Sequence, residues 1–232
     1  MRTIGLIGGM SWESSLEYYR IMNETVKEKL GLLHSAKCIL YSFDFEDVAR
    51  LQHEREWEKL TKMMIEAAQI LEKAGADFIV ICANTMHKMA EDIQNKINIP
   101  ILHIADATSK KILEKNIKRV GLLGTKFTME EDFYKKRLKE KYGIEVIIPD
   151  NKGRETIHNI VYDELCLGVT KQSSKQMTKR IIEDLITAGA KGIVLGCTEI
   201  PLIIKQDDVK VPVFDTTEIH AKTAVDFALN SF

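Results

Sequence analysis

The chain contains two copies of one sequence pattern, and this repeat restricts the possible fold more than any other feature. Residues 71–87 read LEKAGADFIVICANTMH, and residues 185–199 read LITAGAKGIVLGCTE. Each copy has Ala-Gly-Ala, then an apolar run rich in β-branched residues, then a short polar end. Such runs, bounded by turn residues, are typical of buried strands. The repeat therefore predicts two similar halves, each with a buried strand that ends in polar residues.

The two polar ends differ in one important position. Aligning the Ala-Gly-Ala segments matches Ala83 with Cys197, and Asn84-Thr85 with Thr198-Glu199. One half therefore offers a thiol where the other offers only a methyl group. Two matched polar ends of this kind suggest a site built between the halves.

Strand-like and helix-like segments alternate along the whole chain. Strands are expected near residues 3–7, 36–43, 77–82, 100–104, 119–124, 144–148, 191–196 and 211–215. Helices are expected over 14–30, 56–74, a stretch of about ten residues after 87, 106–116, 128–142, 153–167, 174–188 and 216–230. Residues 44–58 are read as a polar, charged segment that leads into a helix. The strands are too apolar to be half-exposed, so we predict an α/β fold with two pseudo-symmetric domains, each a parallel sheet flanked by helices.

The composition excludes several classes of partner. The chain has 33 basic and 34 acidic residues, a net charge of −1, so it lacks the electrostatic footprint of a protein that binds nucleic acid or an anionic membrane. No apolar run approaches the roughly 20 residues that span a bilayer. The first residues enter a strand directly and do not resemble a signal peptide. We expect a cytoplasmic protein.

The four cysteines, Cys38, Cys82, Cys166 and Cys197, are widely spaced and form neither a CxxC pair nor a zinc-ligand cluster. Neither a disulfide framework nor a bound metal is expected. Cys82 precedes Ala83 by one residue, and side chains alternate along a strand. The thiol of Cys82 should therefore lie on the opposite face of the sheet from Ala83, packed in the core.

Four loops follow predicted strands and carry the polar groups that could bind a ligand. They are Gly8-Gly9-Met10, Cys82–Thr85, Gly124-Thr125 and Cys197-Thr198-Glu199. Open parallel sheets bind ligands at the carboxyl ends of their strands, so facing halves would bring these loops together over a small cleft. Their backbone N–H groups, amides and hydroxyls are neutral donors suited to a carboxylate.

Cys197 is the candidate nucleophile or base. It lies between a buried strand and a short predicted helix with Pro201 in the first turn. A helix N-terminus favours negative charge and lowers the pKa of a thiol, so thiolate chemistry is expected at this position. For an acidic ligand, Gln52, His53 and Arg55 after the second strand are candidate contacts, although a solvated charged loop also explains His53 and Arg55. Lys126 is a similar candidate in the second half.

At these residues the sequence resembles the aspartate/glutamate racemase family, whose members racemise amino acids without a cofactor. The matching segments are Gly8-Gly9-Met10-Ser11-Trp12, Asn84-Thr85-Met86-His87, Gly124-Thr125, Gly196-Cys197-Thr198-Glu199 and Val211-Pro212-Val213-Phe214-Asp215-Thr216. The resemblance is closest to the branch that acts on acidic amino acids. It implies two domains around an active-site cleft, no pyridoxal phosphate, and a homodimer. It also implies that residues 1–98 plus 209–232 form the first domain and residues 99–208 the second.

The resemblance further implies a mechanism and a set of site residues. In that family a thiolate removes the α-proton and a thiol on the opposite face of the carbon returns one. The second of these groups matches Cys197, whereas the first, a cysteine or in some members a threonine, aligns with Ala83. Because alanine cannot transfer a proton, racemisation should be impaired. The implied substrate contacts are Met10, Gln52, Asn84, Thr85, Thr125, Thr198 and Glu199.

Several interpretations of Ala83 remain open at this point. Water, Thr85 or His87 could replace the missing acid/base group. The chain could instead be a single-cysteine decarboxylase or isomerase of the same superfamily, similar to the arylmalonate decarboxylases. It could also be a catalytically disabled protein that still binds an amino acid or a dicarboxylate. In each case the expected partner is a small acidic molecule.

Overall fold

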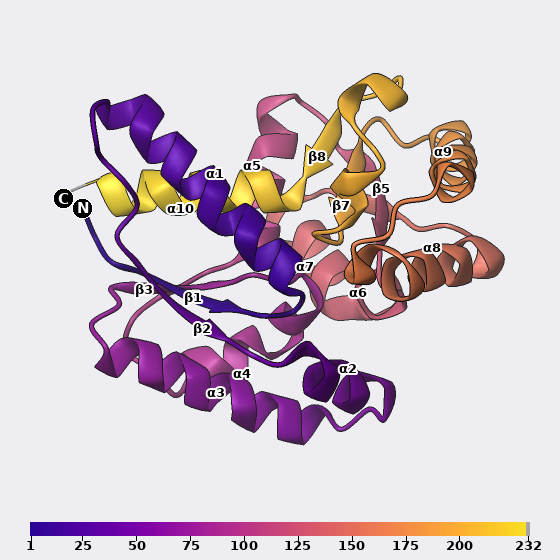
Figure 1. Ribbon diagram of the computed structural model, residues 1–232. Helices are drawn as coiled ribbons and strands as arrows, with labels where there is room; N and C mark the ends of the chain where they lie inside the picture. Colours follow the sequence, from indigo (N-terminus) through magenta and orange to yellow (C-terminus); the bar gives the residue numbers. More distant parts are fainter. Residues whose placement is uncertain (231–232) are drawn as a thin grey trace. The chain divides into compact units, whose positions relative to one another are not determined.

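The computed structural model describes residues 1–230, which divide into two compact units (Figure 1). The first unit comprises Met1–Ile104 together with the segment that begins at His220, and the second comprises Ala105–Ile219. Each unit contains a four-stranded parallel sheet with helices packed against it. The predicted fold class, two similar α/β halves with parallel sheets, is confirmed.

The sheet of the first unit has the strand order β2-β1-β3-β4. These strands are β1 (Ile4–Gly8), β2 (Cys38–Ser42), β3 (Phe78–Ile81) and β4 (Ile101–Leu102). Every residue of β1 and β3 is buried, as expected for apolar strands at the centre of a covered parallel sheet. The strand β2 lies at one edge and is partly exposed.

Helices cover both faces of this sheet. They are α1 (Trp12–Leu30), α2 (Phe45–His53), α3 (Trp57–Lys73), the 3₁₀ helix η1 (Thr85–Met89), α4 (Ala90–Gln94) and most of α10 (Thr216–Leu229). Figure 1 shows α1 and α10 on one face and α3 and α4 on the other. Two apolar clusters fill the two interfaces: Ile4 and Leu6 pack toward α1 and α10, whereas Ile7 and Ile79 pack toward α3. Because successive side chains of a strand point to opposite faces of the sheet, neighbouring residues of one strand belong to different clusters.

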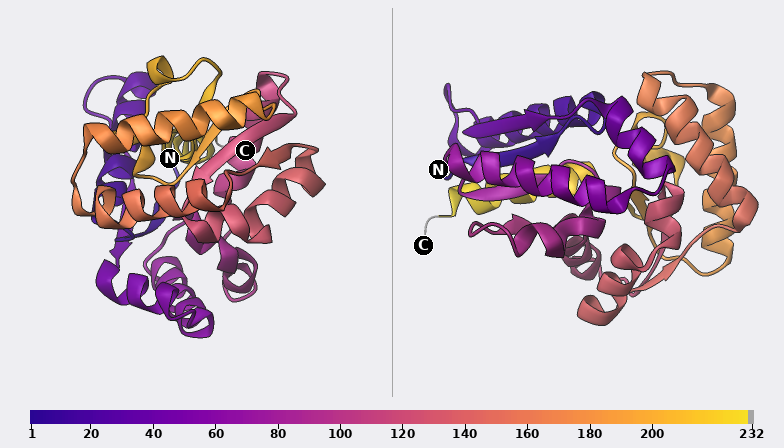
Figure 2. Two further views of the ribbon diagram at one scale, coloured as in Figure 1. Left: turned by 90° about the vertical axis from the view of Figure 1, so that its right-hand side faces the viewer. Right: turned by 90° about the horizontal axis from the view of Figure 1, so that it is seen from below.

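The sheet of the second unit has the equivalent strand order, β6-β5-β7-β8. Its strands are β5 (Arg119–Gly124), β6 (Glu145–Ile147), β7 (Ile193–Gly196) and β8 (Val213–Asp215). Its helices are α5 (Ile104–Glu114, with Ile104 in the first unit), α6 (Lys126–Glu130), α7 (Asp132–Tyr142), α8 (Asn151–Asp163), η2 (Leu165–Leu167), α9 (Gln172–Thr187), η3 (Ile200–Leu202) and η4 (Gln206–Asp208). The helices α8 and α9 contact each other and β5. Figure 2 shows this unit from two further sides.

The internal repeat predicted from the sequence is present in the backbone. The N–H of Ile79 in β3 donates to the carbonyl of Pro100 at 2.9 Å, and the N–H of Ile193 in β7 donates to that of Pro212, also at 2.9 Å. Ile79 and Ile193 are equivalent in the Ala-Gly-Ala alignment, and Pro100 and Pro212 each directly precede the last strand of their sheet. The two halves therefore share a register as well as a strand order.

One element differs from the expectation. The segment 44–58 contains the helix α2, in which Asp44 is the N-cap and its side chain accepts from the N–H of Glu46 at 3.1 Å. Val48 and Leu51 are buried on one side of α2. Their spacing of three residues supplies a helical apolar face even though most of the neighbouring residues are charged. Because most residues of this segment are charged, its short amphipathic helix was not predicted from the sequence.

The unit boundaries also differ from residues 98 and 208, the limits that the resemblance had implied. The strand β4 pairs with β3, so the first unit extends to Ile104. The strand β8 pairs with β7, so the second unit extends to Ile219. The strands β4 and β8, each preceded by a proline, therefore complete the sheets of the first and second units, respectively.

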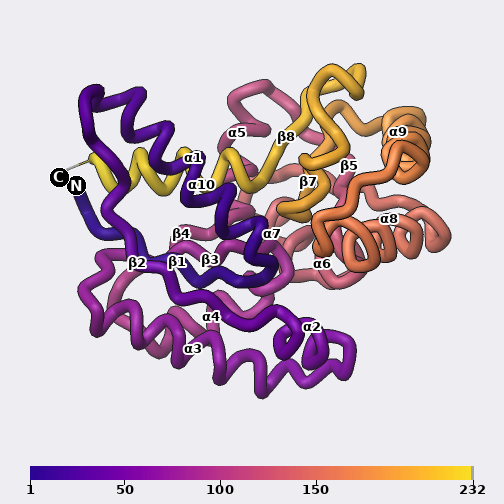
Figure 3. The backbone as a smooth tube through the Cα atoms, viewed as in Figure 1, coloured from indigo at the N-terminus to yellow at the C-terminus, as the bar shows by residue number. Residues whose placement is uncertain are grey.

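The first and last described elements meet within the first unit. The N–H of Arg2 donates to the carbonyl of Ala228 in α10 at 2.9 Å. Figure 3 shows the start of the chain beside the end of α10. Within residues 1–230, no helix combines the length and the apolar character needed to cross a membrane.

Candidate active site

In the first unit, the loops that follow β1 and β3 begin side by side. Ile7 lies opposite Ile81 in the register of these strands, so Gly8-Gly9-Met10 and Cys82–Thr85 leave the same edge of the sheet. Gly9 has φ +79°, and a Cβ at this position would collide with the backbone of Phe43. Only glycine can adopt this conformation so close to the chain that follows β2.

Cys82 and Ala83 lie on opposite faces of this sheet, as predicted. Cys82 is fully buried in the apolar cluster beneath α1 and α10, whereas Ala83 belongs to the cluster that also contains Met10 and Met86. Burial raises the pKa of the Cys82 thiol. Cys82 is therefore a core residue, and the position aligned with Cys197 carries no ionisable group.

Three further predicted site residues are buried around this tip of β3. Asn84 and Thr85 enter η1, and Gln52 reaches the same region from α2, where its Nε2 donates to the sulfur of Met86 at 3.1 Å. By contrast, His53 and Arg55 are exposed, and His53 bonds through Nδ1 to the carbonyl of Ala49. The structure thus gathers Met10, Gln52, Asn84 and Thr85 near Ala83, but not His53 or Arg55.

His87 is held at both ring nitrogens. Its Nε2 lies 3.2 Å from the N–H of Ile104 and its Nδ1 lies 2.8 Å from the carbonyl of Ala83. A backbone N–H can only donate, so Nε2 accepts and the proton resides on Nδ1, which donates to Ala83. The ring of His103 packs against it with centroids 4.6 Å apart. His87 is therefore a neutral residue that fixes the tip of β3.

In the second unit, paired glycines bring the ends of β5 and β7 close together. Gly124 lies opposite Gly196, and a Cβ on Gly124 would be only 2.7 Å from the carbonyl oxygen of Gly196. The loops therefore continue with Thr125 and Cys197 as neighbours. Thr125 is the N-cap of α6, where its Oγ1 accepts from the N–H of Thr128 at 3.2 Å.

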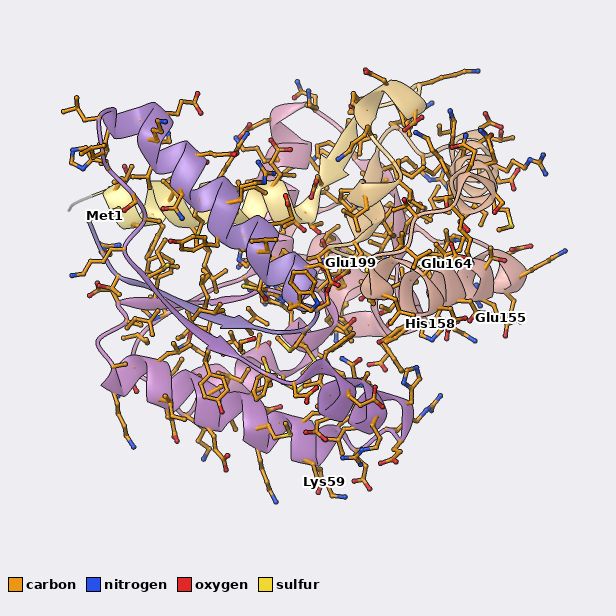
Figure 4. The ribbon with its side chains drawn as sticks, in the orientation of Figure 1. Met1, Lys59, Glu155, His158, Glu164 and Glu199 are labelled. Carbon is orange, nitrogen blue, oxygen red and sulfur yellow. The ribbon has the colours of Figure 1, made fainter. Side chains whose placement is uncertain are left out.

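Cys197, Thr198 and Glu199 form a compact buried group. The Sγ of Cys197 donates to Oε2 of Glu199 at 3.0 Å, and the Oγ1 of Thr198 donates to the same oxygen at 2.8 Å. All three residues are buried, and Glu199 is labelled in Figure 4. A thiol in contact with a carboxylate is a proton donor and a proton acceptor placed within one hydrogen bond.

The expected lowering of the Cys197 pKa is wrong. Burial raises the pKa of this thiol well above its ordinary value of 9.0, and the nearby charge of Glu199 raises it further. The helix that follows is η3, of three residues, so it has little dipole to oppose these effects. The resting form of Cys197 is therefore the neutral thiol.

Sequence reasoning missed Tyr162, which lies near this group. Burial raises the pKa of Tyr162, and negative charge on Cys166, Cys197 or Glu199 raises it further. The phenol is thus a neutral donor in the surroundings of the thiol. Its place on α8, far from Cys197 in the sequence, left no local signal.

His158 lies one helical turn before Tyr162 on α8 and was also missed. The two rings are tilted against each other with centroids 4.8 Å apart. The Nδ1 of His158 accepts from the backbone N–H of Lys126 at 3.3 Å, which ties α8 to the start of α6. Figure 4 labels His158 on this helix. The spacing of four residues was the available sequence signal.

Metal ligands do not gather in the part of the chain that the structure describes. Across residues 1–230, no group of three or more His, Cys, Asp or Glu side chains is arranged to hold a metal ion. The rings of His87, His103 and His220 lie close to one another, but His87 and His220 bond to backbone groups.

Known proteins resemble the chain along most of its length. The racemase RacX of Bacillus subtilis (strain 168), a broad-specificity amino-acid racemase, is 30% identical over 175 residues, which cover 72% of each chain. The glutamate racemase of Aquifex pyrophilus is 26% identical over 193 residues, which cover 80% of this chain and 70% of the relative.

Solved structures agree with this resemblance. A crystal structure of a candidate Asp/Glu racemase from Yersinia pestis superposes with a TM-score of 0.92 and 51% identity, covering 99% of this chain and 100% of that one. An aspartate racemase homologue from Pyrococcus horikoshii OT3 gives a TM-score of 0.85 and 40% identity over 99% of this chain and 100% of that one. The Asp/Glu/hydantoin racemase family profile matches residues 7–224. The chain therefore belongs to the Asp/Glu/hydantoin racemase family, a family of amino-acid racemases.

Proposed function

We propose that the protein transfers protons at the α-carbon of an acidic amino acid through Cys197, without pyridoxal phosphate, and that Ala83 makes its racemisation slow. The observation that carries the proposal is the contact of 3.0 Å between Sγ of Cys197 and Oε2 of Glu199 at the end of β7. It supplies a thiol with an adjacent base at the position where the two repeats diverge.

The raised pKa of Cys197 suits this chemistry. As a neutral thiol, Cys197 can donate a proton to an α-carbanion. After it transfers its own proton to Glu199, the thiolate is a strong base, because basicity rises with the pKa of the conjugate acid. A strong base is required because the α-hydrogen of an amino acid is only weakly acidic. Glu199 and Cys197 thus form a proton-transfer pair, and Tyr162 is a nearby neutral donor.

Ala83 limits the reaction to one side of the stereocentre. Racemisation requires one group to remove the α-proton and another to return a proton to the opposite face. Loss of a positioned acid/base group typically costs ~10²–10⁴-fold in rate. We therefore propose that Cys197 exchanges the α-proton of one enantiomer readily, whereas inversion is slow.

The substrate contacts proposed for the two tips are neutral. They are Met10, Gln52, Asn84, Thr85, Thr125 and Thr198, with Glu199 beside the thiol. The names of the relatives support an amino-acid substrate, with aspartate and glutamate first. None of the four cysteines, all of which lie among the described residues, forms a disulfide, which supports a cytoplasmic location, and we further propose a homodimer.

Deuterium exchange tests the proposed chemistry. Each enantiomer of aspartate and glutamate is incubated with the protein in deuterated water, and loss of the α-proton signal is followed by NMR. We expect exchange from one enantiomer of the preferred substrate and none with Cys197→Ala. Absence of exchange from all four compounds would contradict catalysis at Cys197.

Substitution of Ala83 tests the missing partner. Ala83→Cys and Ala83→Thr should each raise the rate of inversion, measured by chiral chromatography, because they restore a group able to transfer a proton. Thr128→Ser, in the second unit, serves as a conservative control and should leave the rate unchanged. If neither Ala83 variant raises the rate of inversion, position 83 is not the missing acid/base.

A single-cysteine decarboxylase is the second candidate. The neutral state of Cys197 and the methyl group at position 83 favour it, because protonating an enolate after loss of carbon dioxide requires one thiol on one face. Release of carbon dioxide from a disubstituted malonate, lost in Cys197→Ala, would support this activity. Thermal stabilisation by dicarboxylates with neither exchange nor decarboxylation would instead indicate a binding protein.

A further inference from the structure

Glu13, in the first turn of α1, has a buried carboxylate oxygen to which the protein itself offers no donor. Its Oε2 is shielded from solvent and accepts no hydrogen bond. Among the buried side-chain oxygens of residues 1–230 that accept and donate none, this is the only one from a carboxylate. Burying a charged group without a partner is costly, so a ligand that brings a positive charge to Oε2 would be stabilised there.

The first turn of α1 is held against the loops that follow β1 and β3. The Oγ of Ser14, the residue after Glu13, donates to the carbonyl of Cys82 at 3.0 Å. The Oγ of Ser15 accepts from the N–H of Gly9 at 2.8 Å. The candidate site residues of the first unit gather at these strand ends, so Glu13 belongs to the same end of the sheet.

Acidic side chains that follow other strands already accept hydrogen bonds within the protein. They are Asp44 after β2, Asp150 after β6, Glu199 after β7 and Asp215 at the end of β8. Three of them cap the helix that follows, and Glu199 accepts from a thiol and a hydroxyl. Glu13 differs because its buried oxygen has no such structural use.

The substrate of the proposed function presents a group that the neutral contacts do not satisfy. An acidic amino acid has two carboxylates, which suit amide and hydroxyl donors, and one α-ammonium group. An ammonium has three N–H donors and no acceptor, and it requires an acceptor, preferably an anion, when it leaves water. The first turn of a helix favours negative charge, so the place of Glu13 suits an ionised carboxylate.

We propose that Oε2 of Glu13 binds the α-ammonium group of the substrate and so selects amino acids over related acids without an amine. This inference rests on the proposed function and adds to it the residue that recognises the amine. It also separates the two candidate reactions. A disubstituted malonate has two carboxylates and no ammonium, so it would leave the buried oxygen of Glu13 without a partner.

Pairs of ligands that differ only in the amine test this contact. Each enantiomer of aspartate is compared with succinate, and each of glutamate with glutarate, by isothermal titration calorimetry in a Cys197→Ala background that removes turnover. Glu13→Gln retains the shape of the side chain but loses its charge, so Kd for the amino acid should rise about 10–100-fold. Kd for succinate or glutarate should stay the same or fall, because neither has a cation for Glu13 to bind.

Glu17→Gln is the matched control. Glu17 lies one turn further along α1, is partly exposed and pairs with Arg20 at 2.6 Å. Its loss of charge should leave Kd unchanged for both members of each pair. Circular dichroism and thermal unfolding show whether each variant is folded, and Glu13→Ala provides a second substitution should Glu13→Gln fail to fold.

The ligand pairs distinguish failure of this inference from failure of the proposed function. If the parent protein binds an amino acid and Glu13→Gln weakens succinate equally, or weakens neither ligand, Glu13 does not recognise the amine. That result overturns this inference alone. If the parent protein binds succinate or glutarate but neither amino acid, the proposed substrate class is wrong and this inference is overturned with it.

Discussion

At the scale of single residues, the pKa of Cys197 depends more on burial and on Glu199 than on the short helix that follows it. Burial and the charge of Glu199 both raise the pKa of the thiol. We predict that iodoacetamide modifies Cys197 slowly at neutral pH and faster only at a pH above the ordinary thiol value of 9.0. Peptide mass spectrometry gives the rate for each cysteine.

The variant Glu199→Gln isolates the effect of the negative charge of Glu199 on the pKa of Cys197. It removes the negative charge but retains an amide oxygen that can accept from the thiol, so the pH at which Cys197 becomes reactive should fall. Glu164→Gln, which changes a carboxylate that contacts Ser174 and Lys171, is the control and should leave the profile unchanged. A profile unaffected by Glu199→Gln would show that this carboxylate does not influence the thiol.

The sequence was sufficient to predict the faces of the first sheet on which Cys82 and Ala83 lie, but not the pKa of Cys197. Alternation along β3 predicted that Cys82 and Ala83 point to opposite faces, because this property follows from strand geometry alone. The pKa of Cys197 depends on the depth of burial and on the direction in which Glu199 points. Those properties arise only after the chain has folded, and the same is true of the approach of Tyr162 from α8.

At the scale of elements, the contact between β5 and β7 depends on paired glycines. A Cβ on Gly124 would lie 2.7 Å from the carbonyl oxygen of Gly196, and backbone atoms cannot move aside without separating the strands. We predict that Gly124→Ala lowers the free energy of unfolding by about 1–3 kcal/mol and reduces exchange catalysed by Cys197. Urea denaturation and the NMR exchange assay measure the two effects.

Gly121→Ala, in the same strand, provides a matched comparison. Its Cβ would meet the side-chain end of Ile193 at 2.9 Å and that of Leu185 at 3.0 Å, which can shift more easily than a backbone carbonyl. This variant should retain exchange activity even if it loses some stability. Equal loss of activity in both variants would argue against a specific role for the glycine pair at the strand ends.

The elements that sequence reasoning located well are those whose apolar pattern is continuous. The strands β1 and β3 are buried on both faces, and their composition shows it directly. The helix α2 was missed because charged residues surround its three core-facing apolar residues, Phe45, Val48 and Leu51. A short helix of this kind is stabilised by tertiary contacts and by its N-cap, Asp44, rather than by a strong local pattern.

At the scale of the whole molecule, His220 should make stability depend on pH. Its Nε2 donates to the carbonyl of Leu102 and its Nδ1 accepts from the hydroxyl of Tyr18, each at 2.8 Å. Burial lowers the pKa of His220 from 6.5 to about 4. Between these values the unfolded chain binds more protons than the folded chain, so the free energy of unfolding should fall as pH decreases, by on the order of 3 kcal/mol in total.

Urea denaturation at a series of pH values measures this decline. His220→Gln can retain the bonds to Leu102 and Tyr18 but cannot be protonated, so its stability should vary less between pH 6.5 and pH 4. His34→Gln changes an exposed histidine and should follow the unchanged protein. An equally steep decline in His220→Gln would assign the pH dependence to other groups.

Because the second unit is inserted within the sequence of the first, most of α10 belongs to the first unit but is synthesised after the second. Ala221, Ala224 and Val225 of α10 complete the cluster that covers Ile4 and Val80, yet they are translated after the whole of residues 105–219. A nascent chain therefore leaves the part of this face that α10 covers exposed until the inserted unit has been translated, although α1 already covers the rest. During this interval the uncovered apolar surface is a site that a chaperone can protect.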